Sequence, residues 1–225
     1  MMMYYRGRTI FTHALKQLNN YFQLTTSRHF QNPNVTVLSA NKNVCNNRIV
    51  WLDMEMTGLD INTDYILEIA CLITDKNLQV ISKDLNIVVH QPDEILNNMN
   101  DWCLQTHKKT GLIDASRSSK ITIQDAEQAI LEFLKLHVEE KTCPLAGSSV
   151  YMDRIFLYKY MPLVNDYLHY RIIDTTTIKE LIRRWNTDIP ALNKEHDHRA
   201  LSDIKESIKE LELYKTHIFD RCTRN

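Results

Sequence analysis

Glycine is scarce in this 225-residue chain, which has only four, at positions 7, 58, 111 and 147. Their spacing forms neither G-x-x-x-x-G-K-[ST] nor G-x-G-x-x-G, so the usual loops that cradle nucleotide phosphates are excluded. The five cysteines are scattered without any C-x-x-C spacing, which favours reduced thiols over a disulfide or zinc framework. No uninterrupted apolar run reaches about 18 residues, so we expect no membrane association through a spanning helix.

Acidic residues are missing from the first 52 positions, which carry six basic residues: Arg6, Arg8, Lys16, Arg28, Lys42 and Arg48. A basic, acid-free start that mixes Leu, Phe and Tyr among its Arg residues is typical of a mitochondrial transit peptide. We therefore expect residues 1–46 to be a targeting or disordered segment and the protein to reach the mitochondrial matrix. Cytosolic or nuclear forms stay open, and the alternative for the segment is a basic tail that touches nucleic acid non-specifically.

The remaining residues have the opposite charge balance, with 21 basic and 28 acidic side chains. Proteins that track many phosphates spread Lys and Arg along one face. An acidic body therefore favours a short substrate that is gripped mainly at its end.

Hydrophobic periodicity predicts an α/β domain over residues 47–225. Strand patterns cover 48–55, 65–74 and 78–90, and the short link at 75–77 predicts a hairpin between the second and third. Shorter strands are expected at 143–147 and 171–174. Helical patterns cover 101–113, 122–138 with Thr122 as N-cap, 151–161, a segment ending at Trp185, and a last helix containing Leu201 to Tyr214. This order predicts a mixed sheet flanked by helices.

Four carboxylates and one imidazole stand out against this pattern. Asp53 and Glu55 alternate onto the same face of the first strand, about 7 Å apart. Asp153 lies near the start of a helix, and Asp203 lies beside the apolar stripe of the last helix, shortly after His198. Each residue alone has an ordinary structural explanation, such as a solvated face or a helix cap. Together they are the set needed to hold two hard divalent cations and to deprotonate a water molecule.

The chemistry that suits this set is the hydrolysis of a phosphodiester. Two cations neutralise the charged ester and stabilise the departing 3′ oxygen. Carboxylates are the ligands that Mg²⁺ and Mn²⁺ prefer, and without a cation they repel one another. The pKa of histidine lies near working pH, so His198 is the candidate general base.

Longer motifs around these residues resemble the oligoribonucleases, the short-oligonucleotide branch of the DEDDh 3′→5′ exonucleases. The resemblance covers residues 47 to 220. It is carried by Asp53-x-Glu55-x-Thr57-Gly58-Leu59, Leu67-Glu68-Ile69-Ala70, Asp101-Trp102 with His107, Gly147-x-Ser149 with Asp153, His169-Tyr170-Arg171 with Asp174, and His198-x-Ala200 with Asp203. It implies a ribonuclease H-like fold with a mixed five-stranded sheet, two Mg²⁺ or Mn²⁺ ions per active site, and degradation of very short RNA, dinucleotides especially, to nucleoside 5′-monophosphates.

The resemblance also implies roles for individual residues. Asp53, Glu55, Asp153 and Asp203 would be the metal ligands, and His198 would act as the general base. Leu59 would wedge between two bases, and Trp102 and His107 would line the base pocket. The 5′ phosphate would be closed off by Ser149, Arg171 and Thr176. Tyr170 would reach into the site of a neighbouring subunit, which makes a homodimer part of the active site.

Two positions depart from the family pattern, Ser148 and Ser202, where the family usually has asparagine and an acidic residue. Neither removes a catalytic group. Two alternatives stay open on sequence grounds: a DEDDh exonuclease that acts on longer RNA or DNA ends, and a non-catalytic binding module with a nuclease fold.

Overall fold

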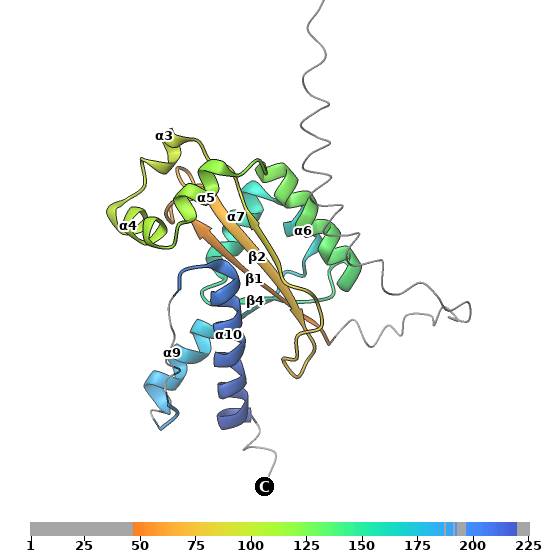
Figure 1. The fold of residues 1–225 in the computed structure, drawn as a ribbon. Helices are drawn as coiled ribbons and strands as arrows, with labels where there is room; N and C mark the ends of the chain where they lie inside the picture. The colour runs from red at the N-terminus through yellow and green to blue at the C-terminus, as the bar shows by residue number, and fades with distance from the viewer. Residues whose placement is uncertain (1–46, 187, 191, 193–196, 220–225) are drawn as a thin grey trace, which may run out of the picture. The chain divides into compact units, whose positions relative to one another are not determined.

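Five strands form one mixed sheet in the computed structural model, which describes residues 47–186, 188–190, 192 and 197–219 (Figure 1). The predicted targeting segment 1–46 lies outside the described residues. The strand order is β3-β2-β1-β4-β5. The bounds are β1 Ile49–Met56, β2 Ile66–Thr74, β3 Leu85–Val88, β4 Leu145–Gly147 and β5 Ile172–Asp174. β1 pairs antiparallel with β2 and parallel with β4, so the predicted mixed sheet is confirmed.

The helices follow the predicted alternation with strands. Their bounds are α3 Asp93–Leu96, α4 Asp101–Lys109, α5 Leu112–Ser118, α6 Ile123–His137, α7 Tyr151–Tyr160, α8 Pro162–Tyr167, α9 Thr175–Trp185 and α10 Ala200–Tyr214, followed by the π-helix η1 Lys215–Phe219. Thr122 caps α6 as predicted, because its side chain accepts from the amide of Asp125 and the Asp125 carboxylate accepts in return. No helix among the described residues is long and apolar enough to cross a membrane.

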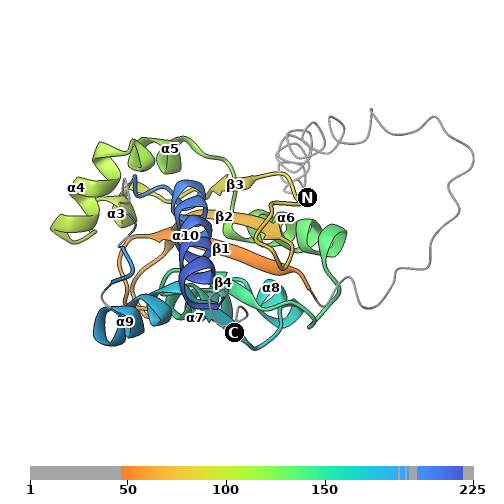
Figure 2. The same ribbon diagram turned by 90° about the horizontal axis from the view of Figure 1, so that it is seen from below.

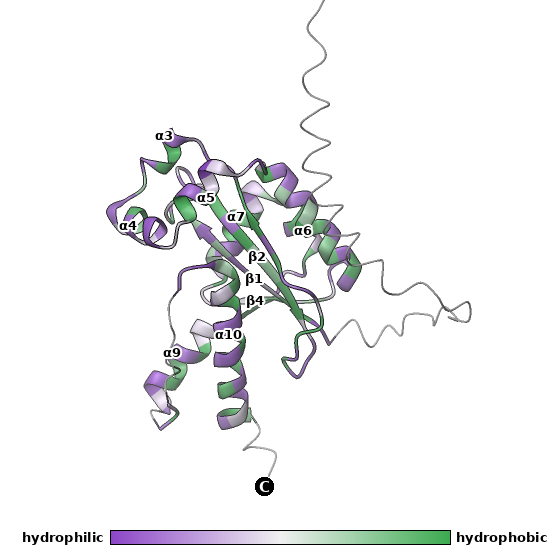
Figure 3. Ribbon diagram, in the orientation of Figure 1, coloured by the Kyte–Doolittle hydropathy of each residue, from purple (hydrophilic) through white to green (hydrophobic). Residues whose placement is uncertain are grey.

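Both faces of the sheet are covered. α10 lies across β1 and β2, where Ala200, Ile204 and Ile208 pack against Trp51 and Leu72 (Figure 2). The alternate residues of β1 are buried on the opposite face, and α6 and α7 contact the sheet there. β2 is buried at all nine positions and is apolar over most of its length (Figure 3). Burial on both faces explains why β2 reads as a nearly continuous apolar run.

The strand predicted over 78–90 is wrong in its first half, because β3 begins only at Leu85. The amide of Ile73 donates to the side-chain oxygen of Ser82 at 2.9 Å, and only a single bridge joins Thr74 to Val80. Leu78 adopts a left-handed conformation with φ 69°. Backbone hydrogen bonds join Asp75 to Gln79 and Ile81 to Ile73, but the Ser82 side chain takes the amide of Ile73, so the ladder after the turn is irregular.

The helix predicted over 101–113 is also divided in two. α4 ends at Lys109 and α5 begins at Leu112. Gly111 between them has φ +72°, a conformation that glycine adopts without steric cost. The division changes the direction of the chain, so that Cys103 of α4 and Leu112 and Ile113 of α5 pack in one cluster with Leu67 of β2.

Gly147 at the end of β4 offers a test of how tightly β4 approaches β1. A Cβ atom there would lie 2.8 Å from the backbone oxygen of Leu52 and 3.0 Å from Val150 Cγ2. We expect Gly147→Ala to lower the free energy of unfolding by about 1–3 kcal/mol, because the strands must separate. Urea unfolding measures this effect. Gly111→Asn is the control, since nothing lies within 4 Å of a Cβ at Gly111, and Asn tolerates positive φ. Equal stability of Gly147→Ala and the wild type would contradict the prediction.

Candidate active site

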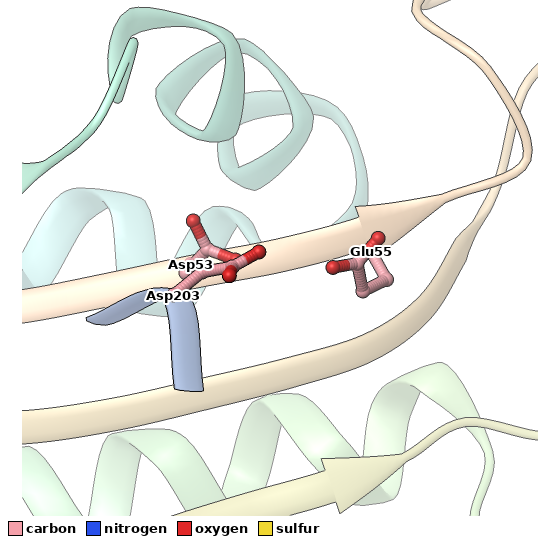
Figure 4. Close-up of side chains that lie close together, drawn as sticks. All are labelled: Asp53, Glu55 and Asp203. Carbon is pink, nitrogen blue, oxygen red and sulfur yellow. The ribbon is translucent and has the colours of Figure 1, made fainter. Parts of the chain in front are cut away.

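Three carboxylates meet over the middle of the sheet. Asp53 and Glu55 come from β1, and Asp203 comes from the first turn of α10 (Figure 4). One oxygen of each lies within 4.8 Å of an oxygen of the others. The structure therefore brings together residues 150 positions apart because α10 packs across β1. The donor set consists of carboxylate oxygens alone, which fits Mg²⁺ or Mn²⁺.

Burial and mutual repulsion keep the carboxyl groups of Asp53 and Glu55 from ionising easily. The pKa of Asp53 is raised well above its usual value by burial, and then by the charges of Asp153 and Asp203. Burial and the charge of Asp203 raise the pKa of Glu55 to about 8. A divalent cation bound among these acids would stabilise their ionised forms.

Asp153 lies in the first turn of α7 and is buried. It is not one of the three mutually close carboxylates, yet its charge raises the pKa of Asp53. Burial raises the pKa of Asp153 itself, although a hydrogen bond from the backbone amide of Met54 opposes the shift. Asp153 on α7 is thus close enough to Asp53 for its charge to act on that residue.

His198 directly precedes Arg199, the N-cap residue of α10, and is half-buried. Its backbone has φ 49°, which is unusual for a residue with a side chain. The Trp102 ring from α4 contacts the imidazole edge-to-face, with centroids 5.4 Å apart. The general base predicted from sequence and a predicted base-pocket residue are therefore neighbours.

The other predicted base-contacting residues surround Met56 and the loop after β1. Leu59 is 66% exposed and free to meet a ligand. His107 is buried, and its Nε2 hydrogen donates to the Met56 oxygen at 2.9 Å, which leaves Nδ1 facing Glu55 Oε2 at 3.9 Å. Burial lowers the pKa of His107, which favours this neutral tautomer.

The predicted phosphate-binding residues fall into two groups. Ser149 Oγ donates to Thr176 Oγ1 at 3.1 Å, and Asp174 accepts from the amides of both residues at 2.9 Å. Tyr170 and Arg171 are exposed on the preceding loop, with the guanidinium 5.6 Å from the tyrosine ring centroid. Within the described residues, the Tyr170 and Arg171 side chains form no hydrogen bond or ion pair with Ser149 or Thr176.

Comparison with known proteins decides the family. Residues 50–211 match the exonuclease family RNase_T. A probable oligoribonuclease from Dictyostelium discoideum is 54% identical over 172 residues, which are 76% of this chain and 90% of that protein. The mitochondrial oligoribonuclease of Homo sapiens is 51% identical over 176 residues, which are 77% of this chain and 74% of that protein. The chain belongs to the oligoribonucleases of this exonuclease family.

Solved structures of more distant proteins share the fold of this oligoribonuclease. A structure of exonuclease I superposes with a TM-score of 0.61 at 15% identity and covers 77% of this chain and 42% of that one. The zinc-bound complex of Escherichia coli exonuclease I with single-stranded DNA superposes with a TM-score of 0.60 at 16% identity, over 79% and 43% of the two chains. The oligoribonuclease chain thus spans about two fifths of these larger proteins, and the likeness concerns the fold.

Three further residues organise the oligoribonuclease site and were given no role by sequence reasoning. Asp64 accepts from Thr57 Oγ1 at 2.8 Å and from the amide of Asp60 at 2.9 Å, which shapes the loop that carries Leu59. Glu68 on β2 pairs with Arg199. A signal for this pair was available, because Glu68 is a lone charge inside an apolar strand and a buried charge needs a partner.

The raised pKa of Glu55 predicts how stability depends on pH when chelator is present. The folded state keeps the proton up to about pH 8, whereas an unfolded glutamate releases it near 4.5. Stability should therefore fall as pH rises between these values, by up to about 1.4 kcal/mol per pH unit. Urea unfolding between pH 5 and 9 measures the slope. Glu55→Gln should reduce it, and so should Mg²⁺, because the cation stabilises the ionised form. A slope unchanged by either would contradict the prediction.

Proposed function

We propose that the protein is a metal-dependent 3′→5′ exoribonuclease that degrades very short RNA, dinucleotides especially, to nucleoside 5′-monophosphates. The observation that carries the proposal is the meeting of Asp53, Glu55 and Asp203 in one half-buried group. The relatives support the proposal, since proteins named oligoribonuclease are 54% and 51% identical in sequence to this chain. An all-oxygen site beside a histidine suits phosphodiester hydrolysis better than redox or thiol chemistry.

The proposed site divides the work among its residues. Asp53, Glu55, Asp203 and Asp153 would hold two Mg²⁺ or Mn²⁺ ions, which supply charge neutralisation at the phosphate and lower the pKa of a water molecule. The imidazole of His198 accepts the proton of the attacking water. The water oxygen forms a bond to phosphorus as the bond from phosphorus to the 3′ oxygen breaks, and the departing oxygen takes up a proton. Trp102 holds the His198 ring by edge-to-face contact.

The preference for a short substrate follows, in this proposal, from the groups at either end. Exposed Leu59 and Trp102 offer apolar surface to the bases beside the carboxylates. The hydroxyls of Ser149 and Thr176, together with Arg171, would bind the 5′ phosphate, since guanidinium binds phosphate through two parallel hydrogen bonds. When these groups enclose the 5′ phosphate of the RNA, no room is left for a further nucleotide on its 5′ side.

The function is tested by comparing a two-nucleotide RNA with a seven-nucleotide RNA and with DNA of both lengths, in Mg²⁺ and then in chelator. We expect the RNA dinucleotide to be turned over fastest and chelator to abolish turnover. Asp203→Asn should reduce the rate by at least roughly 100-fold. Glu212→Gln is the matched control, because it removes an exposed charge from the same helix.

Each alternative has its own outcome in that experiment. Faster cleavage of the longer RNA or of DNA would favour an exonuclease that acts on longer ends. Binding of the dinucleotide without any release of nucleotides would favour a non-catalytic module. Wild-type activity in Asp203→Asn would remove the proposed metal site.

We also propose that the protein is a homodimer, because α7 carries an exposed apolar stripe. Tyr151, Ile155 and Tyr158 follow helical spacing on one face and are 53%, 42% and 75% exposed. Leu163 on α8 and Tyr170 are also exposed, at 54% and 76%. Exposed apolar side chains do not stabilise a monomer, whereas a symmetric interface would bury this set of side chains on both subunits.

The dimer is tested by substituting the most exposed member of the α7 stripe. Light scattering coupled to size-exclusion chromatography should give a dimeric mass for the wild type and a monomeric mass for Tyr158→Glu, because two carboxylates would be buried at the interface. Leu136→Glu is the control, since Leu136 is an exposed apolar residue on α6. A dimeric Tyr158→Glu, or a monomeric wild type, would contradict the proposal.

For localisation we propose the mitochondrial matrix, with residues 47–225 as the exonuclease domain. The basic, acid-free composition of the first 46 residues supports this, and so do the relatives named as mitochondrial oligoribonucleases. Cytosolic or nuclear forms remain compatible with the proposed activity.

A further inference from the structure

Glu68 is the one charged residue within the sequence of β2, and its side chain is fully buried. Hydrogen bonds surround its carboxylate. Arg199 donates from Nη2 at 2.6 Å and from Nε at 3.0 Å, Asn86 Nδ2 donates at 3.0 Å, and the amide of Ala200 donates at 3.1 Å. Burial alone would raise the pKa of Glu68, but the hydrogen bonds and the positive charge of Arg199 hold it below its usual value. Glu68 is therefore ionised in the fold.

Two of the three partners of Glu68 lie in the segment that carries two of the proposed active-site residues. Arg199 directly follows His198, and Ala200 is the first residue of α10. The Arg199 side chain does not cap the helix, so Glu68 satisfies the orphan amide of Ala200 from the neighbouring strand. The amide of Asp203 donates to the Arg199 oxygen at 3.0 Å, which places Asp203 one helical turn after the anchored residue.

The same contact supports the unusual backbone of His198. A residue with a side chain at φ 49° is strained, and such a conformation persists only where the surroundings hold it. On one side of His198, Trp102 contacts the ring. On the other side, the next residue, Arg199, is held against the sheet because its Nε and Nη2 both donate to Glu68.

The ion pair also keeps the local charge in balance. Glu68 lies opposite Glu55 in the register of β1 and β2, so both side chains project from the same face. A lone charge on Glu68 would add to the repulsion among the acids, and the Arg199 guanidinium offsets it. Because the guanidinium is engaged by Glu68, it anchors the segment to β2.

We propose that Glu68 and Arg199 are positioning residues of the active site, whose ion pair fixes residues 198–203 so that His198 and Asp203 face Asp53 and Glu55. The catalytic part of this inference rests on the function proposed above. A buried ion pair contributes little net stability compared with apolar residues of the same size. Placement of the base and of a metal ligand is therefore the stronger reason for a charge in the middle of an apolar strand.

Three variants and a matched control test the inference. Glu68→Gln removes the charge of the acceptor, and Arg199→Met removes the guanidinium. Arg199→Lys keeps a positive charge but cannot form the two parallel hydrogen bonds of a guanidinium. Lys205→Met is the control, because Lys205 on α10 forms an exposed ion pair with Asp84 at 2.6 Å. Each full-length protein is assayed for kcat and KM on a 5′-phosphorylated diribonucleotide, for Mn²⁺ affinity by electron paramagnetic resonance without substrate, and for urea unfolding.

We expect kcat of Glu68→Gln and Arg199→Met to fall about 10- to 100-fold while KM changes less than about threefold, because the substrate contacts are intact and the reacting groups are displaced. Mn²⁺ should bind more weakly to both, since Asp203 moves with the segment. Arg199→Lys should retain more kcat than Arg199→Met. Lys205→Met should match the wild type in kcat and in Mn²⁺ affinity.

The outcomes separate this inference from the proposed function. Variants that lose stability but keep wild-type kcat and Mn²⁺ affinity per folded molecule would show a purely structural ion pair and overturn the inference. An inactive wild type would overturn the proposed function, while the comparison of Mn²⁺ affinities would still decide whether the pair places Asp203. If Glu68→Gln and Arg199→Met do not fold, Arg199→Lys decides, because unchanged kcat and Mn²⁺ affinity in that variant would overturn the inference.

Discussion

The fold of this protein is organised around holding like charges close together. Asp53, Glu55 and Asp203 lie within a few ångströms of one another in a site where burial already disfavours charge. Three carboxylates would separate if their backbones were free to move. They remain together because β1 is the central strand, paired on both sides, and because the apolar side of α10 is packed against Trp51 and Leu72. The hydrophobic core thus supplies the rigidity that the site requires.

The placement of β1 explains how residues distant in sequence reach one site. Its antiparallel partner β2 supplies Glu68, and its parallel partner β4 leads directly into the turn that begins α7 and carries Asp153. α10 packs on Trp51 and Leu72, on the face of the sheet toward which Asp53 projects. Each element contributes only one or two of these polar groups, so most of the packing between the elements stays apolar.

The sequence predicted those parts of the structure that depend on local pattern. Alternation along β1 placed Asp53 and Glu55 on one face, and Thr122 marked the start of α6. The prediction for 78–90 was wrong over its first half, because apolar composition does not reveal that Ser82 takes the hydrogen bond of a ladder amide. The pairing of Glu68 with Arg199 depends on two segments 131 positions apart, and only the packing of α10 on β2 brings them together.

Buried and exposed residues have separate tasks in this site. Glu68 and His107 are held by packing and hydrogen bonds, whereas Leu59 and Trp102 are 66% and 61% exposed. Exposed apolar and aromatic side chains beside a rigid charged centre can meet bases of any sequence, because every base has an apolar face. The body carries more acidic than basic side chains, 28 against 21, which disfavours an extended basic track for a longer strand. Recognition must therefore come from the few groups around the reacting phosphate, and this constraint favours a substrate of only a few nucleotides.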